Sequence, residues 1–174
     1  MKLVLDLQTL DTPTLFCPST ENLHQWIHGA LTFVAPIRAL PNFHESDMPV
    51  EVCLRLVGRE ESAELNRTYR DKAGPTNILS FPYEPPPISL PVYLLGDLVV
   101  CTALVEEEAQ QQSKSYLAHW AHLILHGTLH LLGYDHLTDE EAASMESLEI
   151  QLLETWGFSN PYIFIESIAT DSCV

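Results

Sequence analysis

Apolar and polar residues follow two different periods along this chain, and each period predicts one kind of element. Period-two alternation or a short apolar run predicts strands at residues 3–7, 50–57, 76–81 and 93–101. Apolar residues spaced three and four apart predict helices at residues 60–70, 104–112, 116–132 and 138–156, and a further helix that Thr20 caps and that ends before Pro36. Thr138 and Glu141 have the spacing of a capping box for the last helix.

The order of these elements indicates the fold class. Strands and helices are mixed without a regular series of strand–helix–strand units, which favours an α+β fold with a small mixed sheet packed with helices. With 174 residues and no internal repeat, the chain is expected to form one domain over residues 1–174. Irregular backbone is expected after the third strand because of a cluster of prolines, Pro82, Pro85, Pro86 and Pro87.

The apolar runs and the cysteines of the chain indicate its cellular compartment. No apolar run is long enough to span a membrane, and Asp6 interrupts the N-terminal run too early for a secretory signal, so a cytoplasmic protein is expected. The four cysteines include no CxxC pair, which argues against a disulfide framework and against a thiolate zinc site. Three are expected to be small buried residues and the last lies in a C-terminal tail: Cys17, Cys53, Cys101 and Cys173.

The charge of the chain is strongly negative but unevenly distributed. A net charge of −16 at pH 7 argues, taken alone, against nucleic acid binding, because cations drive phosphate binding. Five of the eight basic residues nevertheless lie in one short stretch, namely Arg55, Arg59, Arg67, Arg70 and Lys72. A local cationic surface on an acidic body is one interpretation of this stretch, and a solvated helix face of mixed charge is the other.

The most specific chemistry lies in the sequence HGTLHLLGYDH at residues 126–136. His126 and His130 are four residues apart, so on a helix they project from one face and can bind a single ion. Gly133 can adopt the left-handed conformation that ends a helix, which lets the chain turn back and bring His136 to the same point. Three neutral imidazoles with a position left open for water are typical of catalytic zinc. We therefore predict that these three histidines bind one Zn²⁺ or a similar ion.

His119 and His122 lie on the same helical stripe, so the trio of His122, His126 and His130 must also be considered. Eight residues of helix rise about 12 Å, whereas each metal–nitrogen bond is about 2 Å long. One helix can therefore supply only two of the ligands. We expect His119 and His122 to be core or surface residues, or hydrogen-bonding partners of the ligands at most.

The residue after His126 bears on the kind of metal chemistry. The zinc peptidase motif HExxH has a glutamate at this position as general base, and this chain has Gly127. A glycine inside a helix either leaves room for substrate or allows another part of the chain to pack closely. A zincin-type metallopeptidase stays an alternative because of the histidine spacing, and Gly127 argues against it.

Three segments point to a known family when they are taken together. LNRTYRDKAGPTNILSFP at residues 65–82, LLGDLVVC at 94–101 and AHWAHLILHGTLHLLGYDH at 118–136 resemble the YbeY endoribonucleases, the bacterial rRNA maturation factors. The resemblance runs from about residue 52 to about residue 162. It implies a zinc-dependent hydrolase that cleaves single-stranded RNA, matures the 3′ end of small-subunit rRNA and acts in ribosome quality control. RNA, ribosomal particles and assembly factors would then be its partners.

The resemblance also implies a zincin-like α+β fold with the metal site at the end of a central helix. In that fold His126, His130 and His136 match the zinc ligands of the family. Arg70 matches the arginine on which the ribonuclease activity of the family depends. Its planar, permanently charged group can hold a phosphate at two points and stabilise the charge that develops during cleavage.

Other residues near these motifs have two readings each. Lys72 could contact a phosphate or be an ordinary surface lysine. Asp135 could orient a ligand or accept a proton, or it could cap the turn after the helix. Ala73 and Asn77 occupy positions where the family commonly or often has aspartate, which argues against a mechanism that needs a carboxylate in this loop. A noncatalytic ribosome-assembly factor, with a metal that only stabilises the fold, is a further alternative.

Overall fold

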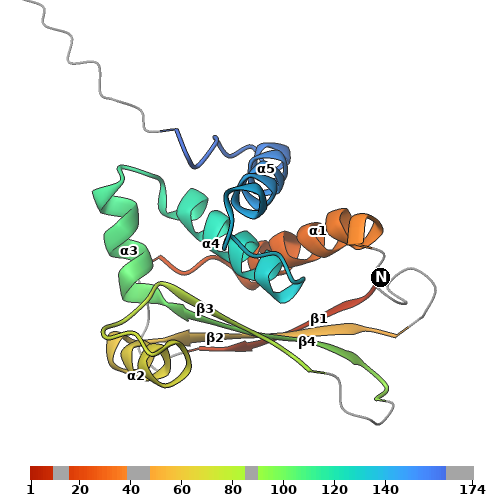
Figure 1. The fold of residues 1–174 in the computed structure, drawn as a ribbon, viewed down its shortest axis with the longest axis horizontal. Coiled ribbons are helices and arrows are strands. Elements are labelled where there is room, and N and C mark those ends of the chain that lie inside the picture. The colour runs from red at the N-terminus through yellow and green to blue at the C-terminus, as the bar shows by residue number, and fades with distance from the viewer. Residues whose placement is uncertain (10–15, 39–47, 85–89, 164–174) are drawn as a thin grey trace, which may run out of the picture.

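The computed structural model describes residues 1–9, 16–38, 48–84 and 90–163, and within these residues four strands form one mixed sheet (Figure 1). The strand order is β1-β2-β4-β3. The first three strands in this order are parallel, and β3 is antiparallel to β4 at the sheet edge. Their bounds are Leu3–Gln8 for β1, Val50–Val57 for β2, Ile78–Pro82 for β3 and Tyr93–Cys101 for β4. The predicted α+β fold with a small mixed sheet is confirmed.

Helices lie on both faces of this sheet (Figure 1). Apolar residues of α1 and α4 share one buried cluster with Val52, Leu54 and Leu56 of β2. On the opposite face, Leu65 of α2 packs against a second cluster that includes Leu79 of β3. Helix α5 lies on α4, on the side away from the sheet (Figure 1). The helices run Thr20–Arg38 for α1, Arg59–Arg70 for α2, Thr102–Gln111 for α3, Tyr116–Leu131 for α4 and Asp139–Thr155 for α5.

The first helix differs from its prediction at both ends. Its N-cap is Ser19, whose Oγ accepts a hydrogen bond from the backbone N–H of Asn22 at 3.2 Å, so Thr20 is the first helical residue. The helix also continues past Pro36 to Arg38. Proline removes one backbone hydrogen bond, and in the last turn of a long, buried helix that loss is too small to end the element.

The last helix matches its prediction. The Thr138 side chain accepts from the backbone N–H of Glu141 at 3.2 Å, and the Glu141 carboxylate accepts from the backbone N–H of Thr138 at 3.1 Å. This reciprocal pair satisfies two of the N–H groups that a helix leaves unbonded at its start. The capping box predicted from the sequence is therefore confirmed.

The cysteines agree only in part with their prediction. Cys101 is buried, whereas Cys17 and Cys53 are half-buried. Cys53 lies beside Asp6 and Asp97 in the register of the neighbouring strands, on the face that α1 and α4 do not cover. Its partial burial, followed by the charges of Asp97 and Asp6, raises the pKa of this thiol to about 11. The predictions for residues 85–87 and for Cys173 lie outside the described residues.

Gly127 explains how α4 approaches the sheet. A Cβ atom at this position would lie 2.6 Å from Ile78 Cδ1, 2.9 Å from Leu98 Cδ2 and 3.2 Å from Ser80 Oγ. The missing side chain therefore lets α4 pack closely on β3 and β4, as the packing interpretation of this glycine requires. In the described part of the chain, no helix has the length and apolar character needed to cross a membrane.

Candidate metal centre

Helix α4 and the turn after it bring three histidines together. The helix begins at an N-cap, Ser115, whose side chain accepts from the backbone N–H of Ala118 at 3.1 Å. It ends before Gly133, which has a φ of 80° and donates its N–H to the carbonyl of His130 at 2.9 Å. This left-handed glycine reverses the chain as the sequence predicted, so His136 returns toward His126 and His130.

The donor atoms of these three side chains are close enough for one ion. One ligand atom from each of His126, His130 and His136 lies within 4.8 Å of the others, and the two helical Nε2 atoms are 3.1 Å apart. Two metal–nitrogen bonds of about 2 Å at a tetrahedral angle place their nitrogens roughly 3.3 Å apart. The cluster could therefore hold a metal ion with little rearrangement, and His136 is exposed to solvent.

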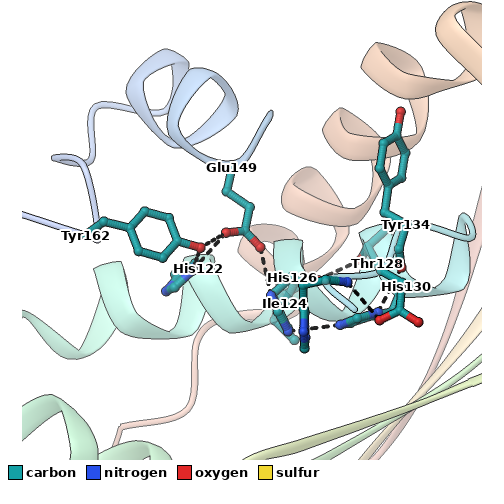
Figure 2. A network of polar contacts seen from close by, with 10 residues as sticks. His122, Ile124, His126, Thr128, His130, Tyr134, Glu149 and Tyr162 are labelled. Atoms are coloured by element: carbon teal, nitrogen blue, oxygen red, sulfur yellow. Dashed lines mark hydrogen bonds and ion pairs between the residues drawn. The ribbon is translucent and has the colours of Figure 1, made fainter. Parts of the chain in front are cut away.

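The second nitrogen of each helical ring has its own partner (Figure 2). His126 Nδ1 lies 2.8 Å from Glu149 Oε1, and His130 Nδ1 lies 2.9 Å from the carbonyl oxygen of Tyr134. A carbonyl and a carboxylate can only accept, so each Nδ1 carries the hydrogen and each Nε2 presents its lone pair. Both rings are thus in the tautomer that binds a metal through Nε2.

The charge state of His130 agrees with this arrangement. Burial, and then the neighbouring imidazoles of His126 and His136, lower the pKa of His130 below its usual range. The ring is therefore neutral at physiological pH, which is the form that binds metals.

Glu149 of α5 is the most deeply buried charged group next to this cluster. Its side chain is 0% exposed and accepts from His126 Nδ1, from His122 Nε2 at 3.3 Å and from the hydroxyl of Tyr162 (Figure 2). Burial by itself raises the pKa of this carboxyl, but the hydrogen bonds from His122 and His126 outweigh it and bring the pKa down to about 2. The group is therefore a carboxylate at neutral pH.

Neither Glu149 nor Tyr162 was predicted from the sequence. One signal was available for Glu149: Met145, Glu149 and Leu152 are spaced four and three apart on the buried face of α5, so an acid occurs where the period requires an apolar residue. Tyr162 lies beyond the helix, and no local pattern links it to a residue on another element.

The other two histidines of α4 lie apart from the cluster. His122 contacts Glu149, and buried His119 lies 2.8 Å through Nε2 from Glu108 of α3. Asn77 donates to both oxygens of Glu108, at 3.2 and 3.0 Å. His119 and His122 are thus core residues or hydrogen-bonding partners, as predicted.

Asp135 caps the turn. Its Oδ1 accepts from the backbone N–H of His136 at 2.8 Å, which agrees with the turn-capping interpretation.

Arg70 and Lys72 lie on the other side of the edge strand from the histidines. Both are exposed at the end of α2, where Asp71 adopts a left-handed conformation with a φ of 55° and ends the helix. Among the described residues, no hydrogen bond or ion pair is found for either side chain. The structure does not bring Arg70 or Lys72 into contact with the cluster.

Two of the other basic residues are paired with acids. Arg55 Nη2 lies 2.6 Å from Glu61, and Arg59 Nη2 lies 2.5 Å from Glu107. Of the five basic residues in this stretch, those without an acidic partner among the described residues are Arg67, Arg70 and Lys72 at the end of α2.

A short series of contacts across β3 connects this cationic end of α2 with α4. The ring of Tyr69 meets the ring of Phe81 of β3 with centroids 5.0 Å apart, and Phe81 is adjacent to Ser80. The Ser80 Oγ in turn faces Gly127, the residue after His126. The two helix segments therefore flank the same edge strand from opposite faces of the sheet.

Comparisons with known proteins agree with the family that the sequence motifs resemble. The family model described as Endoribonuclease YbeY matches residues 16–157. A protein from Colwellia psychrerythraea named Endoribonuclease YbeY is 48% identical over 160 residues, which cover 92% of this chain and 97% of that protein. The solution structure of TM1509 from Thermotoga maritima has a similar fold, with a TM-score of 0.50 and 22% identity over 92% of this chain and 99% of that one.

Proposed function

Because this chain belongs to the YbeY endoribonuclease family, we propose that it is a metal-dependent hydrolase that cleaves single-stranded RNA in the cytoplasm. Its role would be to mature the 3′ end of small-subunit rRNA and to act in ribosome quality control, on ribosomal particles and with assembly factors. The observation that carries the proposal is the convergence of three imidazoles, one of them exposed to solvent, with ligand atoms within 4.8 Å of one another.

We propose Zn²⁺ as the ion and His126, His130 and His136 as its ligands. The donor set fits, because the helical imidazoles are held in the Nε2 tautomer and His130 stays neutral. When bound, the ion would polarise a phosphoryl oxygen or bring a bound water to a pKa near neutrality. The protein holds the rings in place through Glu149 and the carbonyl of Tyr134, so the ligands need little reorganisation.

We propose that the end of α2 contacts the RNA backbone. Arg67, Arg70 and Lys72 are exposed cations without acidic partners among the described residues, and they flank the same edge strand as the histidines. A single strand that crosses this edge could be held by these cations on one side and meet the cluster on the other. Arg70 would stabilise charge that develops on the phosphate, and Lys72 would add a phosphate contact.

A paired measurement tests this function. The purified protein is analysed for bound metal and then incubated with a 3′-extended small-subunit rRNA fragment, with and without a chelator. We expect about one zinc ion per chain and cleavage in the single-stranded extension that stops with chelator and returns when Zn²⁺ is restored. Cleavage that is unaffected by complete metal removal would contradict the proposal.

A peptide panel is the matched specificity control. Gly127 occupies the place of the peptidase glutamate and packs against Ile78 and Leu98, so this helix provides no carboxylate base there. We expect no peptide hydrolysis under conditions that cleave the RNA. Hydrolysis of peptides without RNA cleavage would instead assign the protein to the metallopeptidases.

A further inference from the structure

A buried carboxylate without a cationic partner needs an explanation. Glu149 is 0% exposed, and its partners among the described residues are two imidazoles and a phenol, with no Lys or Arg. Removing a carboxylate from water is costly, and an apolar side chain often serves the stability of a core better. The contacts of this group indicate a role beyond packing α5 on α4.

The two oxygens of Glu149 have different partners. Among the described residues Oε1 accepts from His126 Nδ1 alone, at 2.8 Å, whereas Oε2 accepts from His122 Nε2 at 3.3 Å and from the Tyr162 hydroxyl (Figure 2). Two donors on Oε2 fix the rotation of the carboxylate, which leaves Oε1 directed at His126. The opposite nitrogen of that ring, Nε2, then lies 3.1 Å from His130 Nε2.

His126 and His130 are oriented by acceptors of different strength. His130 donates to the neutral carbonyl of Tyr134, and His126 donates to a charged carboxylate. A charged acceptor makes the stronger hydrogen bond and increases the basicity of the opposite ring nitrogen. The His126 ring should therefore be the more electron-rich of the two.

Tyr162 reaches Glu149 from a segment that follows α5. The Lys114 ammonium donates to the carbonyl of Pro161 at 2.7 Å and ties this segment to the turn between α3 and α4. The Tyr162 ring also meets the edge of the His122 ring, with centroids 5.5 Å apart. The hydroxyl thus completes the set of donors around Oε2 from outside the helix pair.

We infer that Glu149 is a positioning residue for the metal centre, and that Tyr162 and His122 hold its carboxylate so that it fixes the tautomer and direction of His126. The inference rests on the metal role proposed above for His126. Its consequence is that the segment after α5 sets the metal affinity of residues on α4 without touching the ion.

Metal affinity and ring tautomer test this role apart from RNA cleavage. The Kd for Zn²⁺ is measured by competition with a chromophoric chelator in the wild-type chain and in Glu149→Gln, Tyr162→Phe and Glu154→Gln. ¹⁵N NMR of the metal-free protein reports which nitrogen of His126 carries the hydrogen. Glu154→Gln is the matched control, since it removes the same charge from an exposed site on the same helix.

We expect Glu149→Gln to weaken zinc binding by about 10- to 100-fold and to reduce the preference of His126 for the Nδ1–H tautomer. Tyr162→Phe should give a smaller loss in the same direction, and Glu154→Gln should give none. Tyr162 is 39% exposed, so its variant remains a test even if Glu149→Gln does not fold.

Two results would overturn the inference, and they can be told apart. Unchanged zinc affinity and His126 tautomer in folded Glu149→Gln, or in Tyr162→Phe if the first does not fold, would leave Glu149 a purely structural group. A wild-type chain that binds no zinc would instead overturn the proposed metal role itself.

Discussion

The Nε2 atoms of His126 and His130 lie 3.1 Å apart, and neither carries a hydrogen, because each ring donates its Nδ1–H to another acceptor. Two lone pairs at this distance repel each other unless a cation lies between them. The arrangement is therefore more favourable with a metal ion than without one. It leads to a direct prediction for the three histidines.

Replacing His126, His130 or His136 with alanine should reduce bound zinc from about one ion per chain toward zero. The exposed His136 gives the cleanest variant, because its removal leaves the core intact. At a Zn²⁺ concentration 100 times its Kd, the ion should add about 2.7 kcal/mol to the free energy of unfolding. His136→Ala should lose most of this increment in thermal unfolding with and without zinc.

His28→Ala is the control for that experiment, since His28 is a half-buried histidine on α1 outside the cluster. It should keep its zinc and its zinc-dependent stabilisation. One zinc ion per chain in His136→Ala would show that the proposed ligand set is wrong.

Local patterns predicted much of this structure because the decisive interactions are local. The spacing of His126 and His130, the left-handed turn at Gly133 and the capping box of α5 each depend on residues within a few positions of one another. For the same reason β2 and β4 have the bounds that their apolar patterns predicted. Such features need no knowledge of the tertiary fold.

The features that sequence reasoning missed depend on contacts between distant segments. Glu149 lies 23 positions from His126, and only the packing of α5 on α4 brings their side chains together. Asn77 is a second case. Its amide donates to Glu108, 31 positions away, where an aspartate would place a second carboxylate against the first. The asparagine at position 77, where the family often has aspartate, therefore donates to a carboxylate on α3.

Glu108→Gln should destabilise the metal-free protein by about 1–2 kcal/mol at pH 7, with a difference that shrinks in acid. Burial raises the pKa of Glu108, but the hydrogen bonds from His119 and Asn77 outweigh it, so the folded-state pKa lies below the ordinary 4.5. A lowered pKa contributes stability that is present above about pH 4.5 and is lost as the pH falls through the folded-state value.

Urea unfolding of wild type and Glu108→Gln at several pH values between 7 and 3 would measure that difference. Glu106→Gln removes the same charge from the same helix, and the Glu106 side chain has no hydrogen bond or ion pair within the described residues, so its effect should stay within about 0.5 kcal/mol. A difference in unfolding free energy between wild type and Glu108→Gln that grows below pH 4.5 would contradict the lowered pKa of Glu108.

RNA affinity should fall steeply with added salt if the end of α2 contacts phosphates. Each such contact releases counterions, so Arg67→Ala and Lys72→Ala should each lower the slope of log affinity against log salt by about 1. Arg55→Ala changes the net charge equally, but Arg55 is paired with Glu61 at 2.6 Å and should leave the slope nearly unchanged. Affinity that does not depend on salt would remove this surface from RNA binding.

Arg70→Lys separates the chemistry of RNA cleavage from folding. Lysine keeps one charge but loses the planar group that holds a phosphate at two points, so cleavage should drop by about 100-fold. Arg70 is exposed and has no partner among the described residues, so zinc content and thermal stability should stay at wild-type values.

RNA affinity should change less than turnover, because an interaction made chiefly with developing charge affects the transition state more than the ground state. Arg55→Lys is the matched control, because Arg55 is paired with Glu61 at 2.6 Å outside the proposed RNA contact, and it should cleave nearly as well as wild type. A parallel loss of stability and zinc would assign Arg70 to the scaffold, and normal cleavage would exclude it from the mechanism.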